Sequence, residues 1–304
     1  MPDICLLGTG GMLPLRDRFL TSLYYEHNGR AVLIDCGEGT QVAAAAHGVK
    51  LSRIECIFIT HSHGDHIFGL PGLLSSISNT GRTEELRIFA PRSCIPVINA
   101  LANITGGLPY PVSAQPLDED RESDIPLTFI DPLLTVRTLP LSHRVPCLGY
   151  CIELRKKPVF EPERARELGV PVEYWKALHS GQSVTLPGGA VIAPGQVTGS
   201  QREPVKVVYT TDTLPLPEIA GFAENADLFI CEGMYGLPEK KPSLDEKRHM
   251  LMQDACSLAH DAGAKRLWLT HFSPAEKEPE IYEKALKRIF PGVRISSDGE
   301  RITL

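Results

Sequence analysis

Four residues of metal-binding type fall within six positions of this 304-residue chain, at His61, His63, Asp65 and His66. They directly follow Cys56–Thr60, an apolar stretch typical of a buried strand. Imidazole and carboxylate together suit zinc and its first-row neighbours, and the absence of thiolate at this spacing argues against a closed cysteine site. On a tight loop the first two histidines can face one way and Asp65 and His66 another. The loop therefore predicts two adjacent metal ions, the alternative being a solvated histidine-rich loop.

Three more residues that can bind metals stand at or just after expected strand ends: His143, Asp212 and His271. Each alone is more often a hydrogen-bonded structural residue. Together with the loop they form a set of seven ligands, in which one carboxylate, best Asp212, can bridge two cations. Two cations about 3.5–4 Å apart activate water for phosphoryl or acyl hydrolysis.

Short apolar stretches ending in polar clusters alternate with helical segments along most of the chain. This pattern predicts one layered α/β domain whose site lies on the loops at the strand ends. Residues 155–204 depart from it, being rich in Pro, Gly and charge, and we expect them to be an insertion in that domain. A helix is expected from about Glu246 to Ala262, with Gly263 as its stop signal.

Composition excludes several classes of protein. The chain has 31 basic and 37 acidic residues, a net charge of −6, which argues against a generally basic nucleic-acid coat but not against a local basic patch. No apolar run approaches the roughly 20 residues of a membrane span, and the first residues lack the basic start of a signal peptide. We therefore expect a cytoplasmic protein. Its eight cysteines include no Cys-x-x-Cys pair and are expected to be reduced and buried.

The order of motifs resembles the metallo-β-lactamase fold, and specifically the ribonuclease Z family of tRNA 3′-processing endonucleases. The resemblance covers essentially the whole chain. Its matching segments are Leu7-Gly-Thr-Gly-Gly11, Pro14 to Ser22, Asp35-Cys-Gly-Glu-Gly-Thr-Gln41, His61 to His66, Phe68-Gly-Leu-Pro-Gly-Leu-Leu74, Asp212, Glu232, His249 and Thr270-His-Phe-Ser273.

The resemblance implies a single αββα sandwich over residues 1–304, with residues 155–204 as a protruding flexible arm that binds tRNA. It also implies two zinc ions per subunit, although the same donors accept Mn²⁺ or Fe²⁺. In the family's arrangement one zinc is held by His61, His63 and His143. The other is held by Asp65, His66 and His271, with Asp212 bridging the two.

The same resemblance assigns catalytic roles to three residues. Asp65 orients the attacking water or acts as its base. Glu232 and His249 form an acid–imidazole pair placed to protonate the departing 3′ oxygen, a role that suits a histidine polarised by a carboxylate near neutral pH. The alternative for His249 is a solvent-facing residue near the start of a helix.

The expected arm has a local excess of positive charge. Leu154–Leu178 contains six basic and four acidic residues, with Tyr174 and Trp175 among them. Basic groups can hold phosphates, and the aromatic rings can either stack on bases or pack beneath the arm. The alternative is a solvated helix of mixed charge with a small aromatic anchor.

The function expected from these observations is zinc-dependent cleavage of the 3′ trailer from precursor tRNA, leaving a 3′-hydroxyl on the tRNA. The resemblance also implies a homodimer, in which the arm of one subunit grips tRNA cleaved by the other. One alternative is a metal-dependent phosphodiesterase acting on small phosphodiesters or cyclic nucleotides. A second is a non-catalytic protein that binds RNA or metal.

Overall fold

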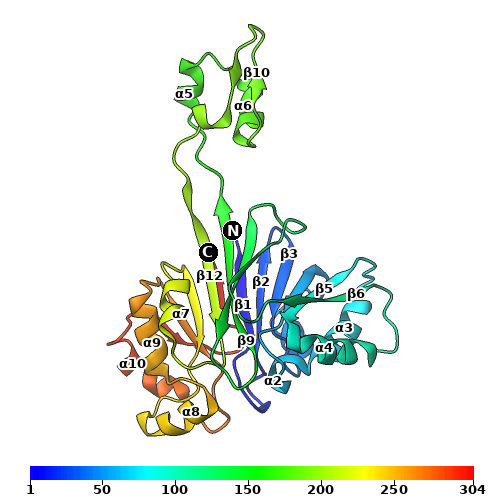
Figure 1. The fold of residues 1–304 in the computed structure, drawn as a ribbon, viewed down its shortest axis with the longest axis vertical. Helices are drawn as coiled ribbons and strands as arrows, with labels where there is room; N and C mark the ends of the chain where they lie inside the picture. Colours follow the sequence, from blue (N-terminus) through cyan, green and yellow to red (C-terminus); the bar gives the residue numbers. More distant parts are fainter. The chain divides into compact units, whose positions relative to one another are not determined.

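A seven-stranded sheet forms the amino-terminal half of the fold in the computed structural model, which describes residues 1–304 (Figure 1). The pairs among the first three strands of the chain are antiparallel, and the sheet continues as a parallel array from β3 to β6. In spatial order the strands are β16 (Arg301–Thr303), β1 (Asp3–Gly8), β2 (Ser22–His27), β3 (Arg30–Ile34), β4 (Ile54–Phe58), β5 (Leu86–Pro91) and β6 (Val112–Leu117).

A second seven-stranded sheet is built from the later part of the chain. Its strands β12 to β15 run parallel, whereas β7 and β8 form an antiparallel pair at the other edge. In spatial order they are β15 (Val293–Ile295), β14 (Leu267–Thr270), β13 (Leu228–Glu232), β12 (Arg202–Thr210), β9 (Cys147–Lys156), β8 (Leu134–Leu141) and β7 (Ser123–Pro126).

Helices cover the outer face of each sheet, and Figure 1 shows the two groups on opposite sides of the strands. The first group is α1 (Thr40–Ala46), α2 (Gly64–Ile67), α3 (Leu70–Ser78) and α4 (Ile95–Asn103). The second group is α7 (Pro217–Phe222), α8 (Lys241–Lys247), α9 (Met252–Asp261) and α10 (Glu283–Leu286). Short 3₁₀ turns occupy Leu51–Arg53, Arg92–Cys94, Pro194–Gln196, Pro238–Lys240 and Pro279–Tyr282.

Strand β4 shows why the layers stack in this order. Ile57 and Ile59 belong to the apolar cluster beneath the first group of helices. Because side chains alternate along a strand, the intervening Phe58 faces the second sheet, where its ring meets the edge of Tyr150 with centroids 5.2 Å apart. Both faces of the sheet are thus apolar and buried, and the predicted αββα order is confirmed.

Residues 153–205 pack as a separate unit, which encloses the predicted insertion of residues 155–204. The unit contains α5 (Pro162–Glu167), α6 (Val172–His179) and a small hairpin of β10 (Val184–Thr185) and β11 (Val191–Ile192). Its own apolar core consists of Ala165, Val170, Leu178, Val184, Ile192 and Val197.

The aromatic residues Tyr174 and Trp175 pack within this unit. Tyr174 and Trp175 lie against the unit's core, and the Trp175 indole N–H donates a 3.0 Å hydrogen bond to the carbonyl oxygen of Val170. The Arg166 guanidinium covers the indole ring at 5.5 Å from its centroid. Of the two uses expected for these rings, the structure therefore supports packing rather than free stacking on bases.

The prediction of one helix from about Glu246 to Ala262 is wrong, because that range includes parts of two helices. α8 ends at Lys247 and is followed by Arg248, whose φ of 59° is left-handed, and α9 begins only at Met252. The extended segment between them buries Met250 in the core beside α9 and turns His249 inward, where it is only 6% exposed. The alternative of a solvent-facing His249 is therefore also wrong.

All eight cysteines are free and buried, as predicted. None of the helices combines the length and the apolar character that crossing a membrane requires.

Candidate functional site

Polar side chains from both sheets meet at the carboxyl ends of the parallel strands. In the first sheet, Asp35 follows β3 and His61 follows β4. In the second sheet, Asp212 follows β12, Glu232 ends β13 and His271 follows β14. Because neighbouring parallel strands end at the same edge, these loops converge. The edge brings all nine predicted site residues into one cluster.

The backbone at this edge is unusual. Asp35, Asp212 and His271 have φ values of 60°, 28° and 59°, in a region that favours glycine. Such a conformation costs roughly 1–3 kcal/mol per residue and persists only where the surroundings impose it. The fold therefore tolerates backbone strain at the three strand ends that turn carboxylate or imidazole groups into the cluster.

The first ligand group consists of His61, His63, His143 and Asp212. Nδ1 of His63 lies 3.0 Å from Nε2 of His61 and 3.2 Å from Nε2 of His143. Oδ2 of Asp212 is 3.6 Å from the same nitrogen of His61 and 3.7 Å from that of His143. Three ring nitrogens and one carboxylate oxygen thus face a common point, an arrangement that suits a single cation.

The second ligand group consists of Asp65, His66 and His271. The Nε2 atoms of the two histidines are 3.3 Å apart. Oδ2 of Asp65 lies 3.4 Å from Nε2 of His271 and 3.7 Å from that of His66. The second oxygen of Asp212, Oδ1, completes this group at 3.2 Å from His66 and 3.1 Å from His271.

Asp212 therefore presents one oxygen to each group, and its side chain is 3% exposed. The ion pairs of Asp65 and Asp212 are formed with histidines alone, and no Lys or Arg neutralises either carboxylate. Buried carboxylates without such a partner call for another cation. The donors present, imidazole nitrogen and carboxylate oxygen, fit divalent zinc, manganese or iron.

Electrostatics also favour cations at this edge. Burial lowers the pKa of His61 well below its ordinary value and that of His143 to about 4, so that both rings are neutral near pH 7. Neutral imidazole is the form that binds metal. Burial opposes ionisation of Asp65 and Asp212, but the neighbouring histidines, His66 and His271 among them, hold the pKa of each carboxyl well below its ordinary value.

Beside the ligand groups, Glu232 and His249 form the predicted pair. Oε2 of Glu232 lies 3.0 Å from Nδ1 of His249, and its other oxygen accepts the backbone N–H of Thr213. Nε2 of His249 points to the cluster, 4.0 Å from Oδ2 of Asp212. Burial opposes charge on the ring, but the Glu232 carboxylate outweighs it and raises the pKa of His249 to about 9. The ring is therefore a protonated donor near neutral pH.

Four residues of the site were missed as functional residues by sequence reasoning. Asp35 accepts a 2.8 Å hydrogen bond from Nδ1 of His66, and Thr60 contacts both Asp35 and His61. The Met12 N–H donates to Oδ2 of Asp65 at 2.6 Å. Nδ1 of His143 lies 3.1 Å from the carbonyl oxygen of Arg248, whose guanidinium returns a 3.0 Å bond to the carbonyl oxygen of His143. Only Asp35 gave a signal, as a carboxylate in a glycine-rich turn at a strand end.

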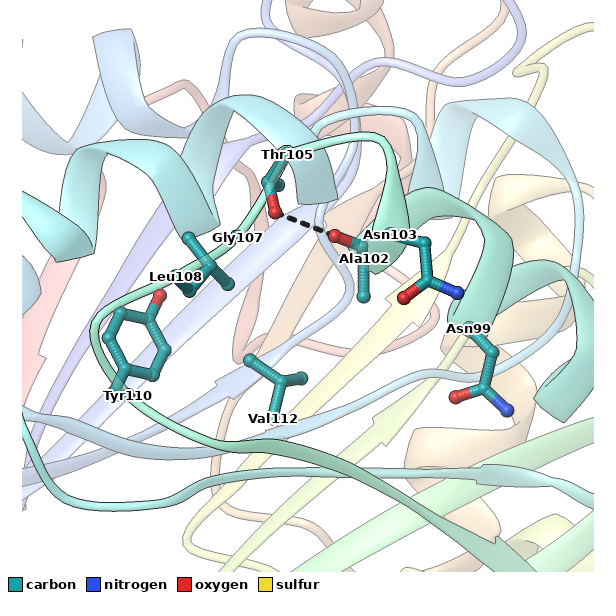
Figure 2. A pocket seen from close by; sticks show the side chains of 8 residues that line it. All are labelled: Asn99, Ala102, Asn103, Thr105, Gly107, Leu108, Tyr110 and Val112. Atoms are coloured by element: carbon teal, nitrogen blue, oxygen red, sulfur yellow. Dashed lines mark hydrogen bonds between the residues drawn. The ribbon is translucent and has the colours of Figure 1, made fainter.

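A separate depression of about 210 Å³ lies at the end of α4, away from this cluster (Figure 2). Figure 2 shows Thr105 donating to the carbonyl oxygen of Ala102, at 2.7 Å. The Tyr110 hydroxyl donates a 2.7 Å hydrogen bond to the carbonyl oxygen of Leu74. The lining contains no carboxylate, imidazole, amine or thiol, so it offers no acid–base or metal chemistry. The lining residues are Asn99, Ala102, Asn103, Thr105, Gly107, Leu108, Tyr110 and Val112.

Comparison of the sequence with known proteins identifies one family and two relatives. A β-lactamase superfamily domain matches residues 30–272. Over 304 residues the chain is 41% identical to a protein named ribonuclease Z from Lachnoclostridium phytofermentans, a match that covers 100% of this chain and 98% of the relative. A ribonuclease Z from Clostridium acetobutylicum is 40% identical over 303 residues, covering 98% of this chain and 96% of the relative.

Among solved structures, the short form of human tRNase Z superposes with a TM-score of 0.69, covering 99% of this chain and 98% of the human one. Its sequence identity is 24%, so this likeness bears on the fold alone.

Proposed function

The chain belongs to the ribonuclease Z family of the β-lactamase superfamily, and on that premise we propose how its residues perform tRNA 3′ processing. The reaction is endonucleolytic removal of the 3′ trailer from precursor tRNA, with a 3′-hydroxyl left on the tRNA. The observation that carries the proposal is the position of Asp212, between two ligand groups and 4.0 Å from an acid–imidazole pair. Hydrolysis of a phosphodiester requires both an activated water and a proton for the leaving oxygen.

The two ligand groups would hold two divalent cations, zinc in our proposal. His61, His63 and His143 would hold one ion, Asp65, His66 and His271 would hold the other, and Asp212 would contribute to both. When bound, such a pair of ions supplies an activated water and neutralises charge that develops on the phosphate. The fit of the donor atoms supports this assignment, and Mn²⁺ or Fe²⁺ would use the same donors.

Asp65 orients the attacking water in this proposal. Its carboxylate is held by the Met12 N–H and lies beside His66 and His271. Because these histidines keep its pKa well below the ordinary value despite burial, the carboxylate is ionised and a weak base. A weak base held in place by hydrogen bonds is better suited to accept a hydrogen bond from water than to remove its proton.

His249 donates the proton to the departing 3′ oxygen. Its pKa of about 9 keeps the ring protonated near pH 7, and Glu232 fixes the ring through Nδ1. The free Nε2–H then faces the ligand cluster, where the leaving oxygen departs. After the proton has been transferred, the Glu232 carboxylate favours reprotonation of the ring.

The unit of residues 153–205 holds the body of tRNA in our proposal. Over its whole length it contains seven basic and six acidic residues, so its charge is nearly balanced. Arg164 and Arg166 are paired with Glu161 and Glu163. We therefore assign most of the phosphate contact to the unpaired run Arg155-Lys-Lys157. We further propose a cytoplasmic homodimer in which one subunit's unit grips the tRNA that the other cleaves.

The test is an assay of purified, zinc-loaded protein on precursor tRNA, with both product ends mapped. The expected products are tRNA with a 3′-hydroxyl and an intact trailer with a 5′-phosphate. Stepwise shortening of the trailer, or hydrolysis of small phosphodiesters without cleavage of precursor tRNA, would contradict the proposal.

A further inference from the structure

Thr60 touches one histidine of each ligand group. It immediately precedes His61, and it is fully buried. Its hydroxyl oxygen lies 3.0 Å from Nδ1 of His61 and 3.3 Å from Nδ1 of His66. The same oxygen lies 2.9 and 3.0 Å from the two carboxylate oxygens of Asp35. One hydroxyl group is therefore shared by a carboxylate and by two imidazoles that belong to different ligand groups.

The direction of these hydrogen bonds follows from what each group can donate. A carboxylate only accepts, so the single hydroxyl hydrogen of Thr60 points to Asp35. The lone pairs of the hydroxyl then face the two histidines, and Asp35 also accepts from Nδ1 of His66 at 2.8 Å. Both rings must therefore carry hydrogen on Nδ1, so Nε2 is the nitrogen through which His61 and His66 can bind a metal ion.

Those two Nε2 atoms are the ones that enter the ligand groups. Nε2 of His61 faces His63 and Asp212, and Nε2 of His66 faces His271 and Asp212. A metal-binding histidine needs its second nitrogen held by a neighbour, because this fixes both the tautomer and the orientation of the ring. At this site the neighbour is the same hydroxyl for a ligand of each group.

We propose that Thr60 is a positioning residue that sets the tautomer of His61 and His66 together, so that loss of its hydroxyl weakens both metal positions at once. This inference rests on the two-metal centre proposed above. The proposed role belongs to the hydroxyl group of Thr60 and not to its backbone.

The backbone contacts of Thr60 allow the hydroxyl to be tested separately. Its N–H donates to Oδ1 of Asp35 at 2.8 Å, and its carbonyl oxygen accepts from Leu148 at 3.0 Å. Thr60→Val keeps these bonds and the shape of the side chain, and it removes only the hydroxyl. Thr60→Ser keeps the hydroxyl and removes only the methyl group.

Cys147 supplies a matched control. Its buried thiol lies 3.7 Å from Nδ1 of His61, on the same side of the ring as Thr60, and no contact joins it to His66. Cys147→Ala therefore disturbs the surroundings of one histidine only. If coupling through Thr60 is what matters, this variant weakens at most the position that contains His61.

The experiment measures zinc retained per subunit after dialysis of the full-length protein against a graded series of chelator buffers. Wild type and Thr60→Ser are expected to retain two zinc ions over the same range. Thr60→Val is expected to lose both together, at free zinc concentrations about 10–100-fold higher than wild type, the range typical for loss of such a neighbour. Cys147→Ala is expected to keep the second ion as wild type does.

Several results would overturn the inference. Thr60→Val could retain both ions like wild type, or lose only one of them. Loss of both ions from Thr60→Ser would show that the methyl group is responsible. This outcome can be read even if Thr60→Val does not fold. A wild-type protein that binds no zinc would remove the proposed centre itself. If wild type binds two ions and cleaves precursor tRNA, and Thr60→Val retains zinc as wild type does, only the inference about Thr60 is wrong.

Discussion

Replacement of Glu232 by Gln tests the assignment of the proton donor. Glu232 is fully buried, and one of its oxygens holds His249 while the other holds the backbone of Thr213. Glutamine has nearly the same shape and keeps an oxygen acceptor, so the variant removes chiefly the negative charge. With that charge gone, burial favours the neutral form of the ring, and only the smaller effects of Asp212 and Asp65 on the pKa of His249 still oppose it.

The size of the effect follows from the pKa of His249. The rise from 6.5 to about 9 corresponds to roughly 3 kcal/mol of preference for the charged ring, at about 1.4 kcal/mol per pH unit. Bound cations repel the charged ring and lower this pKa in wild type and variant alike, so the difference between them is the quantity to compare. Loss of a general acid typically lowers a rate by about 10²–10⁴-fold.

The assay is kcat/KM against pH, from about 5.5 to 9.5, on precursor tRNA and on bis(p-nitrophenyl) phosphate. The nitrophenolate group leaves without a proton, so the small ester does not need His249. Glu232→Gln is expected to lower precursor cleavage at pH 8 by at least about 100-fold and to move the alkaline limb of the profile to lower pH. Hydrolysis of the small ester is expected to stay within a few-fold of wild type.

The exposed Glu239→Gln is the control for this experiment and should behave as wild type. An equal loss of both reactions in Glu232→Gln would contradict this role for Glu232, because the carboxylate would then support the whole site rather than the proton donor. An alkaline limb that does not move would refute it as well.

Three further predictions concern the separate unit, a glycine and a histidine. Replacing residues 155–204 by a short Gly-Ser turn, which the neighbouring strands β9 and β12 allow, should abolish precursor-tRNA cleavage and spare small-ester hydrolysis. Equal retention of both activities would remove the tRNA-binding role. Gly8→Ala would place a Cβ 1.9 Å from the carbonyl oxygen of Leu20, so urea denaturation should show a free energy of unfolding lower by about 1–3 kcal/mol. At Gly221 an added Cβ meets nothing within 4 Å, so Gly221→Ala should unfold with the same free energy as wild type. Burial lowers the pKa of His27 despite the neighbouring Asp131, so as the pH falls the unfolded chain binds this proton before the folded chain does. The free energy of unfolding therefore decreases as the pH drops below about 6.5. Between pH 7.5 and 5.5 His27→Gln should lose less of this free energy than wild type, and an equal loss would contradict the prediction.

The metal ligands could be predicted from the sequence because the chain places them at strand ends. An apolar stretch before His61, before Asp212 and before His271 indicates a buried strand, and parallel strands end at a common edge. Local pattern and one topological rule therefore suffice to bring these residues together. The αββα order came from the resemblance to a known family, because the strand pattern alone predicted only a layered α/β domain.

The break between α8 and α9 could not be predicted in this way. Residues 246–250 contain no Gly or Pro, so nothing in the sequence separates them from the helical apolar spacing of residues 251–262. What ends the helix is tertiary structure, since Glu232 holds His249 inward and Met250 fills the core. A contact between residues 17 positions apart overrides the local preference.

Thr60 and Arg248 illustrate a second limit. A threonine at the end of a strand is unremarkable in sequence, and its role depends on a hydroxyl that reaches Asp35, 25 residues away, and His66. Arg248 contacts His143 across 105 residues. Residues that support ligands have no fixed spacing from them, so only the folded structure identifies them.

If Asp212 joins two metal positions in one catalytic centre, Asp212→Ala must change both zinc content and precursor cleavage, measured on the same sample. Asp212→Ala is expected to hold fewer than two zinc ions per subunit and to cleave at least about 10³-fold more slowly, whereas the exposed Asp261→Ala is expected to keep both at wild-type values. An Asp212→Ala protein with two zinc ions and wild-type turnover would contradict this role of Asp212.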